Sequence, residues 1–375
     1  MIPFNLPHLT GREFTYIQEA VAGGQLAGNG AFTRRCQAWL EDRFQAPRVL
    51  LTQSCTSALE MAALLADIQP GDEVIMPSFT FVSTANAFVL RGATPVFVDI
   101  RTDTLNIDER LVEAAITPRT KAIVAVHYAG VACQMDVLLD IASRRNLILI
   151  EDAAQAFAST WNGRPLGGLG QLSAISFHET KNVISGEGGA LIVNDARLIS
   201  RAEILWEKGT DRVRFHRGEV GKYSWVDVGS SYLPSEVTAA FLWAQLEDAD
   251  TITRKRLSLW NAYYAKCADI PCLRRPVIPA GRTHNAHMFQ VLLSAGIDRA
   301  PVLQALNSQG VNAVFHYVPL HSSPAGRRFA RTASGMEVTD DYSARLVRLP
   351  LWTDMTGDLV DTVVDTVREV LATQR

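Results

Sequence analysis

The chain has few cysteines and no large excess of charge of either sign. Its five cysteines form no CxxC pair and no cluster with histidine, so neither a zinc site nor a disulfide framework is indicated. The 36 lysines and arginines nearly balance the 39 aspartates and glutamates, which leaves a formal net charge of −3. This balance argues against nucleic acid or an anionic membrane as a partner and favours a small-molecule substrate.

Membrane and targeting signals are also missing. Residues 1–5 contain no cationic stretch leading into an apolar core, and no apolar run approaches the roughly 20 residues that a bilayer span requires. We therefore expect a cytoplasmic protein. With 375 residues, 47% of them hydrophobic, the chain is long enough for a large core and more than one domain.

Three familiar functional signatures are incomplete. His178 and Glu179 begin like a zinc-protease helix, but Asn182 stands where the second histidine is needed, so no metal is expected. The segment Gly28-Asn29-Gly30 lacks the third glycine of a dinucleotide loop, and no segment matches the GxxxxGK[ST] phosphate loop. No serine lies in a GxSxG elbow, which removes the main support for an α/β-hydrolase.

Short apolar runs alternate with helical patterns over residues 49–194. The runs predict buried strands of a mostly parallel sheet at residues 49–51, 73–76, 94–98, 122–126 and 147–150. The stretches between them carry apolar residues at helical spacing, as in 57–66, 83–90 and 135–143. The pattern predicts an α/β fold whose ligands bind beyond the carboxyl ends of the strands.

The pattern becomes mainly helical after residue 194. Helices are predicted at 198–207, 235–246 and 252–267, followed by a strand at 287–293 and helices at 300–309 and 359–371. We expect a large domain over residues 1–250, including an N-terminal helical segment. A smaller C-terminal α+β domain is expected over residues 251–375.

Two acids end the predicted strand at 147–150. A carboxylate at this ligand-binding edge is costly unless it has a partner, and a pyridinium nitrogen would be one, because the acid would keep that ring protonated as an electron sink. For Asp152 alone, a strand-end acid bonded to backbone amides is the commoner reading. Lys181 follows another predicted strand at 173–178, and a lysine in a partly apolar pocket can form a Schiff base. Most lysines, however, are solvated surface charges.

Two further segments lie just after predicted strands. Ser54-Cys55-Thr56-Ser57 opens a predicted helix, where backbone N–H groups can bind a phosphate, although an ordinary N-cap is the commoner use. Phe81 offers a ring to cover a flat cofactor, although aromatic residues at such places are more often core. The residues alone therefore support only a ligand-binding α/β enzyme.

Together these segments resemble the DegT/DnrJ/EryC1/StrS family of sugar aminotransferases, a branch of the fold-type I pyridoxal-phosphate enzymes. The resemblance covers nearly the whole chain. It rests on the segments 71–81 (GDEVIMPSFTF), 151–156 (EDAAQA), 176–182 (SFHETKN), 186–189 (GEGG) and 316–321 (HYVPLH). It implies an aspartate-aminotransferase-like fold with pyridoxal 5'-phosphate (PLP) as cofactor, pyridoxamine phosphate (PMP) as intermediate, and a homodimer with active sites at the interface.

The resemblance also implies roles for individual residues. Lys181 would form the imine with PLP, Asp152 would pair with the pyridine nitrogen, and Gln155 would contact the ring hydroxyl. The remaining expected cofactor contacts are the phosphate ligands Cys55, Thr56 and Ser176, and Phe81 on the ring face. The residues expected to border the sugar-nucleotide site are Asn182, His316 and Tyr317.

The chain departs from the family at residues 229–233. Many members have Gly-Tyr-Asn-Tyr-Arg there, and the asparagine or its neighbour reaches the partner subunit's phosphate. Here the sequence is GSSYL, so Ser231 is the candidate for that contact, with a shorter reach.

Within the family, residues 127–133, 177–182 and 229–233 resemble the members that aminate dTDP-4-keto-6-deoxy-D-glucose with L-glutamate. Those members make dTDP-4-amino-4,6-dideoxy-D-galactose for enterobacterial common antigen, within lipopolysaccharide biosynthesis. The alternatives are another nucleotide-sugar 3- or 4-aminotransferase, a PLP-dependent sugar dehydratase, in which relatives replace the imine lysine by histidine, and a non-catalytic PLP-binding protein.

Overall fold

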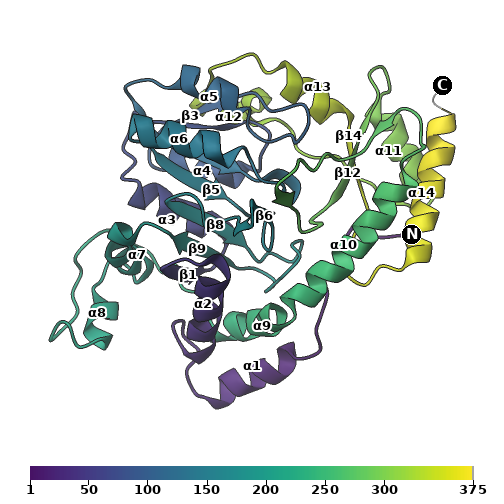
Figure 1. The fold of residues 1–375 in the computed structure, drawn as a ribbon. Helices are drawn as coiled ribbons and strands as arrows, with labels where there is room; N and C mark the ends of the chain where they lie inside the picture. Colours follow the sequence, from purple (N-terminus) through teal and green to yellow (C-terminus); the bar gives the residue numbers. More distant parts are fainter. Residues whose placement is uncertain (374–375) are drawn as a thin grey trace.

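The computed structural model describes residues 1–373 and is built around an eight-stranded sheet (Figure 1). The strand order is β1-β9-β8-β5-β4-β2-β3-β13. Every strand predicted from an apolar run is present. The bounds are β1 (Arg48–Thr52), β2 (Glu73–Pro77), β3 (Thr94–Val98), β4 (Thr120–Val126), β5 (Ile148–Asp152), β8 (Leu172–Ser176), β9 (Gly189–Val193) and β13 (Arg331–Thr332).

The sheet is mostly parallel, as predicted. Neighbouring strands from β8 through β5, β4, β2 and β3 to β13 are parallel, whereas β9 runs antiparallel to both β8 and β1. The sequence analysis did not predict β9. Its apolar run at 190–193 resembles the runs that were assigned to strands, and its antiparallel direction could not be foreseen because periodicity says nothing about strand direction.

Helices cover both faces of this sheet, which explains why its strands are apolar on both sides. One face packs against α3 (Cys55–Leu65), α4 (Val82–Val89) and α7 (Ile199–Trp206). The other packs against α2 (Ala31–Phe44), α5 (Glu109–Ala115), α6 (Met135–Arg145) and α9 (Glu236–Glu247), with α1 (Glu13–Ala22) lying on α9. We call this assembly the large domain.

A second core belongs to a smaller sheet, and we call its assembly the small domain. The antiparallel strands β10 (Leu273–Arg274), β12 (Phe289–Leu293) and β14 (Leu346–Leu349) pack with α10 (Ala249–Lys266), α11 (Arg299–Ser308) and α14 (Gly357–Ala372). The predicted boundary between residues 250 and 251 falls at the start of α10, the long helix that leads from one domain to the other (Figure 1). The boundary stays a prediction.

The two domains do not correspond to two continuous stretches of the sequence. Ile2 forms a bridge with Val311, so the N-terminus lies against the small domain. The segment with α12 (Pro324–Phe329) and α13 (Glu337–Arg345) returns to the large domain, where β13 pairs with β3. The N-terminal residues and the segment 324–345 therefore both contribute to the contact between the domains.

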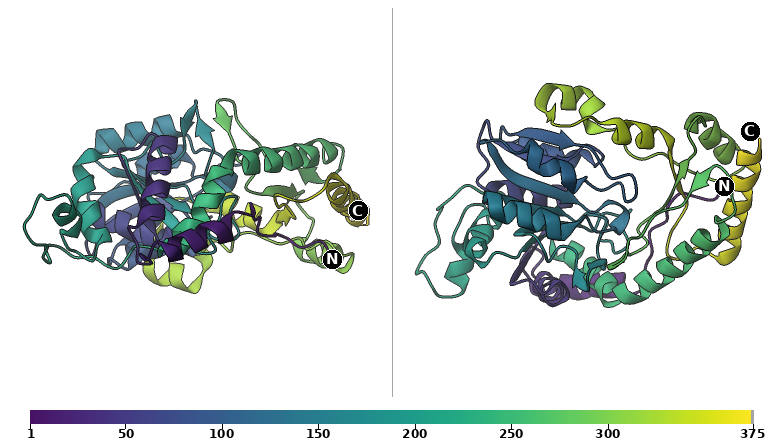
Figure 2. Two further views of the ribbon diagram at one scale, coloured as in Figure 1. Left: turned by 90° about the horizontal axis from the view of Figure 1, so that it is seen from below. Right: turned by 45° about the horizontal axis from the view of Figure 1, so that its top comes forward.

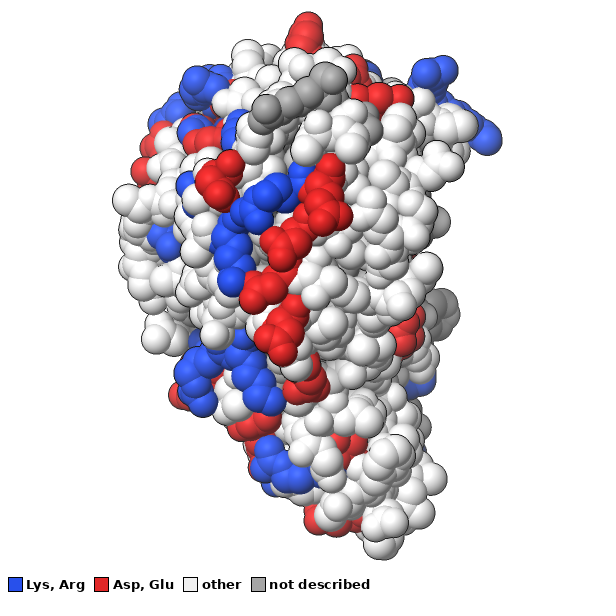
Figure 3. Space-filling model, turned by 90° about the vertical axis from the view of Figure 1, so that its right-hand side faces the viewer, with Lys and Arg blue, Asp and Glu red and all other residues white. Residues whose placement is uncertain are grey.

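Ion pairs stabilise the outer surface of the small domain. Lys266 pairs with Asp361, and Arg368 with Asp269 at 3.2 Å, which joins α10 to α14. Figure 3 shows basic and acidic side chains side by side on this face. Within residues 1–373, no helix combines the length and the apolar character that a bilayer crossing requires.

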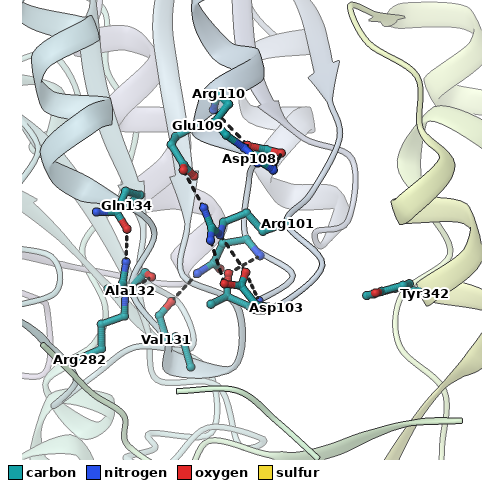
Figure 4. Close-up of polar contacts among 12 residues, drawn as sticks. Arg101, Asp103, Asp108, Glu109, Arg110, Val131, Ala132, Gln134, Arg282 and Tyr342 are labelled. Atoms are coloured by element: carbon teal, nitrogen blue, oxygen red, sulfur yellow. Dashed lines mark hydrogen bonds and ion pairs between the residues drawn. The ribbon is translucent and has the colours of Figure 1, made fainter. Parts of the chain in front are cut away.

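A small three-stranded sheet lies between the domains, formed by β11 (Arg282–Thr283), β6 (Thr160–Trp161) and β7 (Arg164–Pro165). Figure 4 shows how Arg282 holds this sheet to the large domain: its guanidinium donates to Gln134 Oε1 at 2.5 Å and to the carbonyl of Ala132 at 3.0 Å. Asn106 holds the same segment, residues 131–134, because its Nδ2 donates to the carbonyl of Val131 at 2.9 Å. These contacts order residues 131–134, which follow β4.

Candidate active site

The two acids at the end of β5 point to opposite faces of the sheet, because side chains alternate along a strand. Glu151 is fully buried on one face and accepts four hydrogen bonds. The donors are His127 Nε2 at 2.9 Å and the amides of Gly167, Leu169 and Gly170 at 2.9, 2.7 and 2.7 Å. Glu151 thus satisfies backbone groups, which leaves Asp152 as the acid that faces a ligand.

Asp152 lies on the other face, against α3 and α4. Its Oδ2 accepts a hydrogen bond from Thr84 Oγ1 at 2.6 Å, and its Oδ1 accepts one from the amide of Ala154 at 3.2 Å. Thr84 is held in turn by Thr80, with 2.8 Å between the two hydroxyl oxygens. These contacts fix the carboxylate at the edge of a cavity of about 450 Å³.

Lys181 reaches the same cavity from the loop between β8 and β9. Burial lowers the pKa of its amine, while the negative charge of Asp152 opposes that shift. A lysine that loses its proton more readily is a better nucleophile toward an aldehyde. The structure therefore gives Lys181 the environment that Schiff-base chemistry needs.

The start of α3 supplies backbone donors to the cavity. Ser54 is the N-cap and accepts the amide of Ser57 at 3.1 Å, which leaves the amides of Cys55 and Thr56 without an acceptor among residues 1–373. Gly189, the first residue of β9, lies so close that a Cβ there would come within 2.4 Å of the Cys55 nitrogen. Close backbone packing at this helix start therefore explains Gly189, whereas Gly186 has no atom within 4 Å and is explained by its φ of +80°.

Two more of the predicted cofactor residues line the cavity. Ser176 ends β8 and is buried, with its hydroxyl 3.4 Å from the amide of His178. Phe81 is the N-cap of α4 and is 57% exposed, so its ring lies at the mouth of the cavity rather than in a core. The position of Phe81 fits the prediction of a ring that covers a flat ligand.

Gln155 links the cofactor end of the cavity to the small-domain side. Its Oε1 accepts the amide of Ala129 at 2.7 Å, and its Nε2 donates to the Tyr317 hydroxyl at 2.8 Å. Beside it, the Tyr128 hydroxyl lies 3.0 Å from His316 Nδ1. Burial lowers the pKa of His316 and raises that of Tyr317, so both are neutral at pH 7.

The structure sets two predicted site residues apart from the others. Asn182 is buried and points away from the cavity, because its Nδ2 donates to the carbonyl of Asn285 at 2.7 Å and its Oδ1 accepts from His287 Nδ1 at 3.1 Å. Ser231 is exposed and lines a different hollow of about 1070 Å³, together with Arg34 and Arg212. One protomer therefore does not bring Ser231 to its own cofactor cavity.

The sequence analysis missed several residues that line the cavity, among them Thr84, His287 and Arg348. His287 comes from the segment before β12, and Arg348 comes from β14. The available signal was a charged residue in the apolar run Leu346-Val347-Arg348-Leu349, since a charge inside a buried strand needs a reason.

Comparison with known proteins identifies the family. The model of the DegT/DnrJ/EryC1/StrS aminotransferase family matches residues 7–368. The chain belongs to this family. Among curated proteins, it is 32% identical to the spore coat polysaccharide biosynthesis protein SpsC of Bacillus subtilis, over 99% of this chain and 97% of SpsC.

Solved structures of relatives have the same fold. The aminotransferase TlmJ from Streptoalloteichus hindustanus has a TM-score of 0.92 at 30% identity and covers 100% of this chain and 99% of its own. The PMP form of Spr1654 from Streptococcus pneumoniae has a TM-score of 0.93 at 25% identity and covers 100% of both chains. Spr1654 has also been solved in a PLP form, with a TM-score of 0.91.

These findings confirm the predicted family, the fold-type I architecture, the class of PLP-dependent aminotransferase, and PLP with a PMP intermediate as cofactor. The cavity fits that cofactor by its own chemistry. It combines a desolvated amine on Lys181, a fixed carboxylate on Asp152 and unsatisfied amides at Cys55 and Thr56. These groups can hold an aldehyde, a pyridinium and a phosphate respectively.

Proposed function

We propose that the enzyme transfers the amino group of L-glutamate to the 4-keto carbon of dTDP-4-keto-6-deoxy-D-glucose. The products are dTDP-4-amino-4,6-dideoxy-D-galactose and 2-oxoglutarate. The pathway served is the synthesis of enterobacterial common antigen, within lipopolysaccharide biosynthesis. Because both substrates are small soluble metabolites, we place the reaction in the cytoplasm.

The observation that carries the proposal is a lysine amine whose pKa is lowered by burial, in the same cavity as a carboxylate held by Thr84. A sugar substrate is supported by the relatives: SpsC is a spore coat polysaccharide biosynthesis protein, and Spr1654 is described as a sugar aminotransferase. The 4-keto position and the dTDP carrier rest on the resemblance of residues 127–133, 177–182 and 229–233.

The large domain would hold the cofactor. Asp152 would keep the ring nitrogen protonated, Gln155 would donate from Nε2 to the ring hydroxyl, and Phe81 would cover the ring face. The phosphate would be bound by the amides of Cys55 and Thr56 and by the hydroxyl of Ser176. When bound, PLP supplies an aldehyde that exchanges amines and a ring that withdraws electrons from the adjacent carbon.

Proton transfer is the task of Lys181. With the cofactor bound, Lys181 Nζ would be the base that removes the proton from the α-carbon of glutamate and passes it to the cofactor in the first half-reaction. In the second half-reaction it would carry a proton from the cofactor to C4 of the sugar. Burial suits this role, because an amine with a lowered pKa can accept and give up a proton near neutral pH.

The sugar nucleotide would enter along the small-domain wall. His316 and Tyr317 lie at that wall, and both keep a neutral ring with one polar atom tied to the large domain, at Tyr128 and Gln155 respectively. Asn182 would act indirectly, by orienting His287 through its 3.1 Å hydrogen bond.

A homodimer completes the proposal. The segment carrying α8 (Arg212–His216) stands out from the large domain (Figure 2) and exposes several apolar side chains. Trp225 is 80% exposed, and Val226 and Val228 are about half exposed, which is unusual for a surface that faces only water. In a dimer this surface would pack on the second copy, and Ser231 would face the partner's phosphate site. Sedimentation equilibrium of the holoenzyme should give twice the monomer mass, and a monomer would contradict the proposal.

Lys181 separates the proposal from its main rival. A sugar dehydratase of this fold replaces the imine lysine by histidine, whereas this chain keeps the lysine. An aminotransferase acting at a 3-keto carbon remains the alternative within the same chemistry. A PLP-binding protein without catalysis is disfavoured, because Asp152, Gln155, Ser176 and Lys181 all line one cavity.

The deciding experiment incubates the holoenzyme with L-glutamate or L-glutamine and a panel of 3-keto and 4-keto sugars on dTDP and UDP. Mass spectrometry and NMR of the product identify the amine position and its stereochemistry. We expect the 4-amino galactose derivative from glutamate. An amine at C3, or a product that has lost a hydroxyl without gaining nitrogen, would overturn the assignment.

Lys181→Ala is the matching variant. It should abolish transamination and remove the visible absorbance that lysine-bound PLP gives, while the fold stays intact. Lys121→Ala, an exposed lysine at the start of β4, is the control and should keep both properties. Normal turnover by Lys181→Ala would contradict the assignment of Lys181 as the catalytic lysine.

A further inference from the structure

His287 is held rigidly at the small-domain wall of the cofactor cavity. The residue is buried, and both of its backbone polar groups are bonded: the amide donates to Asn285 Oδ1 at 3.1 Å, and the carbonyl accepts from Arg256 Nη2 at 2.9 Å. Asn285 is anchored in turn, because its Nδ2 donates to the carbonyls of Gln155 and Phe157 at 2.9 and 2.8 Å. The imidazole ring therefore extends from a backbone that is tied to the large domain.

The hydrogen bonds around His287 determine which ring nitrogen carries a hydrogen. Asn182 Nδ2 donates to the carbonyl of Asn285 at 2.7 Å, so the other atom of that amide, 3.1 Å from His287 Nδ1, is the oxygen. A carboxamide oxygen only accepts hydrogen bonds, and Nδ1 must therefore donate. Burial lowers the pKa of His287, and the positive charge of Lys181 adds to the shift, so the ring is neutral at pH 7. The second nitrogen, Nε2, then presents a lone pair without a hydrogen.

Nε2 is the polar atom of His287 that lacks a partner. Among residues 1–373 it takes part in no hydrogen bond and no ion pair, and it is not enclosed by neighbouring atoms, so it faces the cavity. His316, the other histidine of this wall, is different, because the Tyr128 hydroxyl 3.0 Å from its Nδ1 can either donate or accept. The small-domain wall thus contains one acceptor whose position and tautomer are both fixed.

His287 and the reacting amine belong to the same part of the cavity. Asn182, the hydrogen-bond partner of the ring, directly follows Lys181 in the chain. After burial, the charge of Lys181 has the largest effect on the pKa of His287. The substrate carbon that exchanges a proton must lie within reach of Lys181 Nζ. We therefore expect Nε2 to face the groups on that carbon or on its neighbours.

The two substrates differ in the hydrogen-bond donors that they place there. Besides the reacting amine, the α-carbon of glutamate carries a carboxylate and an aliphatic chain, and neither can donate at neutral pH. In a 4-keto-6-deoxy sugar, C5 carries the ring oxygen and a methyl group, which do not donate either. The hydroxyl on C3 is the only donor on a carbon next to the ketone. A neutral acceptor therefore suits the sugar and not the amino acid.

We propose that His287 Nε2 accepts a hydrogen bond from the C3 hydroxyl of the keto sugar. This contact selects an acceptor sugar with a hydroxyl beside the keto carbon, because a sugar without it leaves a buried acceptor unpaired. Asn182 is the positioning residue, since it fixes the tautomer of His287. The inference rests on the proposed 4-keto sugar and adds the group by which that sugar is recognised.

The test compares two ketones that differ only in that hydroxyl, dTDP-4-keto-6-deoxy-D-glucose and its 3-deoxy analogue. Each is titrated by calorimetry into the holoenzyme in its PLP form, which has no amino group to transfer, so binding is measured without turnover. The wild type should bind the 3-deoxy analogue roughly 10- to 100-fold more weakly, the usual effect of leaving a buried polar group unpaired. Equal affinities would overturn the proposal.

His287→Asn removes the acceptor and keeps the donor. Its amide nitrogen can take the place of Nδ1 beside Asn182 Oδ1, while nothing replaces Nε2. The affinity for the hydroxylated ketone should fall to that for the 3-deoxy analogue, whose own affinity should not change. Binding of dTDP and the rate of the half-reaction with L-glutamate, followed by absorbance, should match the wild type. A slower glutamate half-reaction with equal losses for both ketones would assign His287 to the support of Lys181 and overturn the proposal.

Two further variants separate recognition from folding. His287→Gln places an amide oxygen at about the depth of Nε2, so it should keep part of the preference for the hydroxylated ketone, and it replaces the asparagine variant if that one fails to fold. His284→Asn is the control, because the His284 ring packs on Trp260, with centroids 4.3 Å apart, and does not line the cavity. It should bind both ketones as the wild type does. A wild-type enzyme that binds dTDP but neither ketone would reject the proposed sugar itself, whereas equal binding of both ketones would reject only the role of His287.

Discussion

Glu151→Gln tests whether Glu151 stabilises the fold while Asp152, the other acid at the end of β5, faces the ligand. The carboxylate accepts two hydrogen bonds at each oxygen: Leu169 and Gly170 donate to Oε1, and Gly167 and His127 donate to Oε2. A glutamine has nearly the same shape but only one oxygen. Either orientation of its amide turns an NH₂ group toward two donors.

The expected loss of stability follows from the number of hydrogen bonds that the substitution removes. Two hydrogen bonds to a charged acceptor are lost, each contributing roughly 1.5–3 kcal/mol, and buried donors are left unpaired. We expect a loss of about 3–5 kcal/mol, the range seen when one partner of a buried charged pair is removed. His127 cannot relieve the conflict by changing tautomer, because its Nδ1 already accepts the amide of Cys133 at 3.2 Å.

Urea unfolding followed by circular dichroism measures this loss. The midpoint should fall by about 1 M, since m for a chain of this size lies at or above roughly 3 kcal/mol per molar. Glu60→Gln is the control: burial raises the pKa of Glu60, so removing that charge should not destabilise the protein. An unchanged midpoint for Glu151→Gln would refute the reading of Glu151 as a charged structural acceptor.

The pH dependence gives an independent check. Burial acts to raise the pKa of Glu151, but the hydrogen bonds from His127 and from the amides of Gly170 and Gly167 outweigh it and hold the pKa below the ordinary value of 4.5. The stabilisation is therefore complete above about pH 4.5 and is lost as the pH falls through the lower folded-state pKa. The glutamine variant should lack this part of the acid-induced loss.

Three further predictions concern the cofactor site and its support. Asp152→Asn should keep the fold but weaken PLP binding and lower transamination by about 10³-fold or more, because an uncharged partner no longer holds the ring nitrogen protonated; near-normal turnover would contradict that role. Phe81→Ala should weaken PLP binding about tenfold by uncovering the ring face, measured by absorbance titration, with normal affinity as the contrary result. Gly130→Ala should lower stability by more than about 2 kcal/mol, because the added Cβ would lie 2.2 Å from Asn285 Oδ1 at a φ of +78°. Gly163→Ala, with the same φ but no atom within 4 Å, should cost about 1 kcal/mol by thermal unfolding, and equal losses at both glycines would argue against the contact.

The parallel part of the sheet could be predicted because its chemistry is local. Strands buried on both faces must be apolar throughout, and the runs at 73–76 and 122–126 appear as β2 and β4 with nearly the predicted bounds. β13 could not be found in the same way. It consists of Arg331 and Thr332, and it exists because its segment returns to β3 from the far end of the chain.

The candidate site residues also differ in whether a local sequence pattern could predict them. Asp152 and Lys181 follow strands, so a sequence pattern placed both at one edge of the sheet. Asn182 was included because its segment borders the sugar-nucleotide site in relatives, but its side chain bonds to Asn285 and His287 instead. Arg348 belongs to no local motif, because its place in the cavity depends on how β14 lies relative to the large domain.

The cavity has a large-domain side and a small-domain side, and the contacts between them suggest how the two sides depend on each other. The cofactor-facing groups belong to the large domain, whereas His287, His316 and Arg348 come from segments of the small-domain side. The hydrogen bonds from Gln155 to Tyr317 and between Tyr128 and His316 join the two sides. Substitutions of the cofactor-facing groups of the large domain should therefore impair the binding of PLP and every later step, whereas a change at Arg348 should leave PLP in place and impair only the steps that follow.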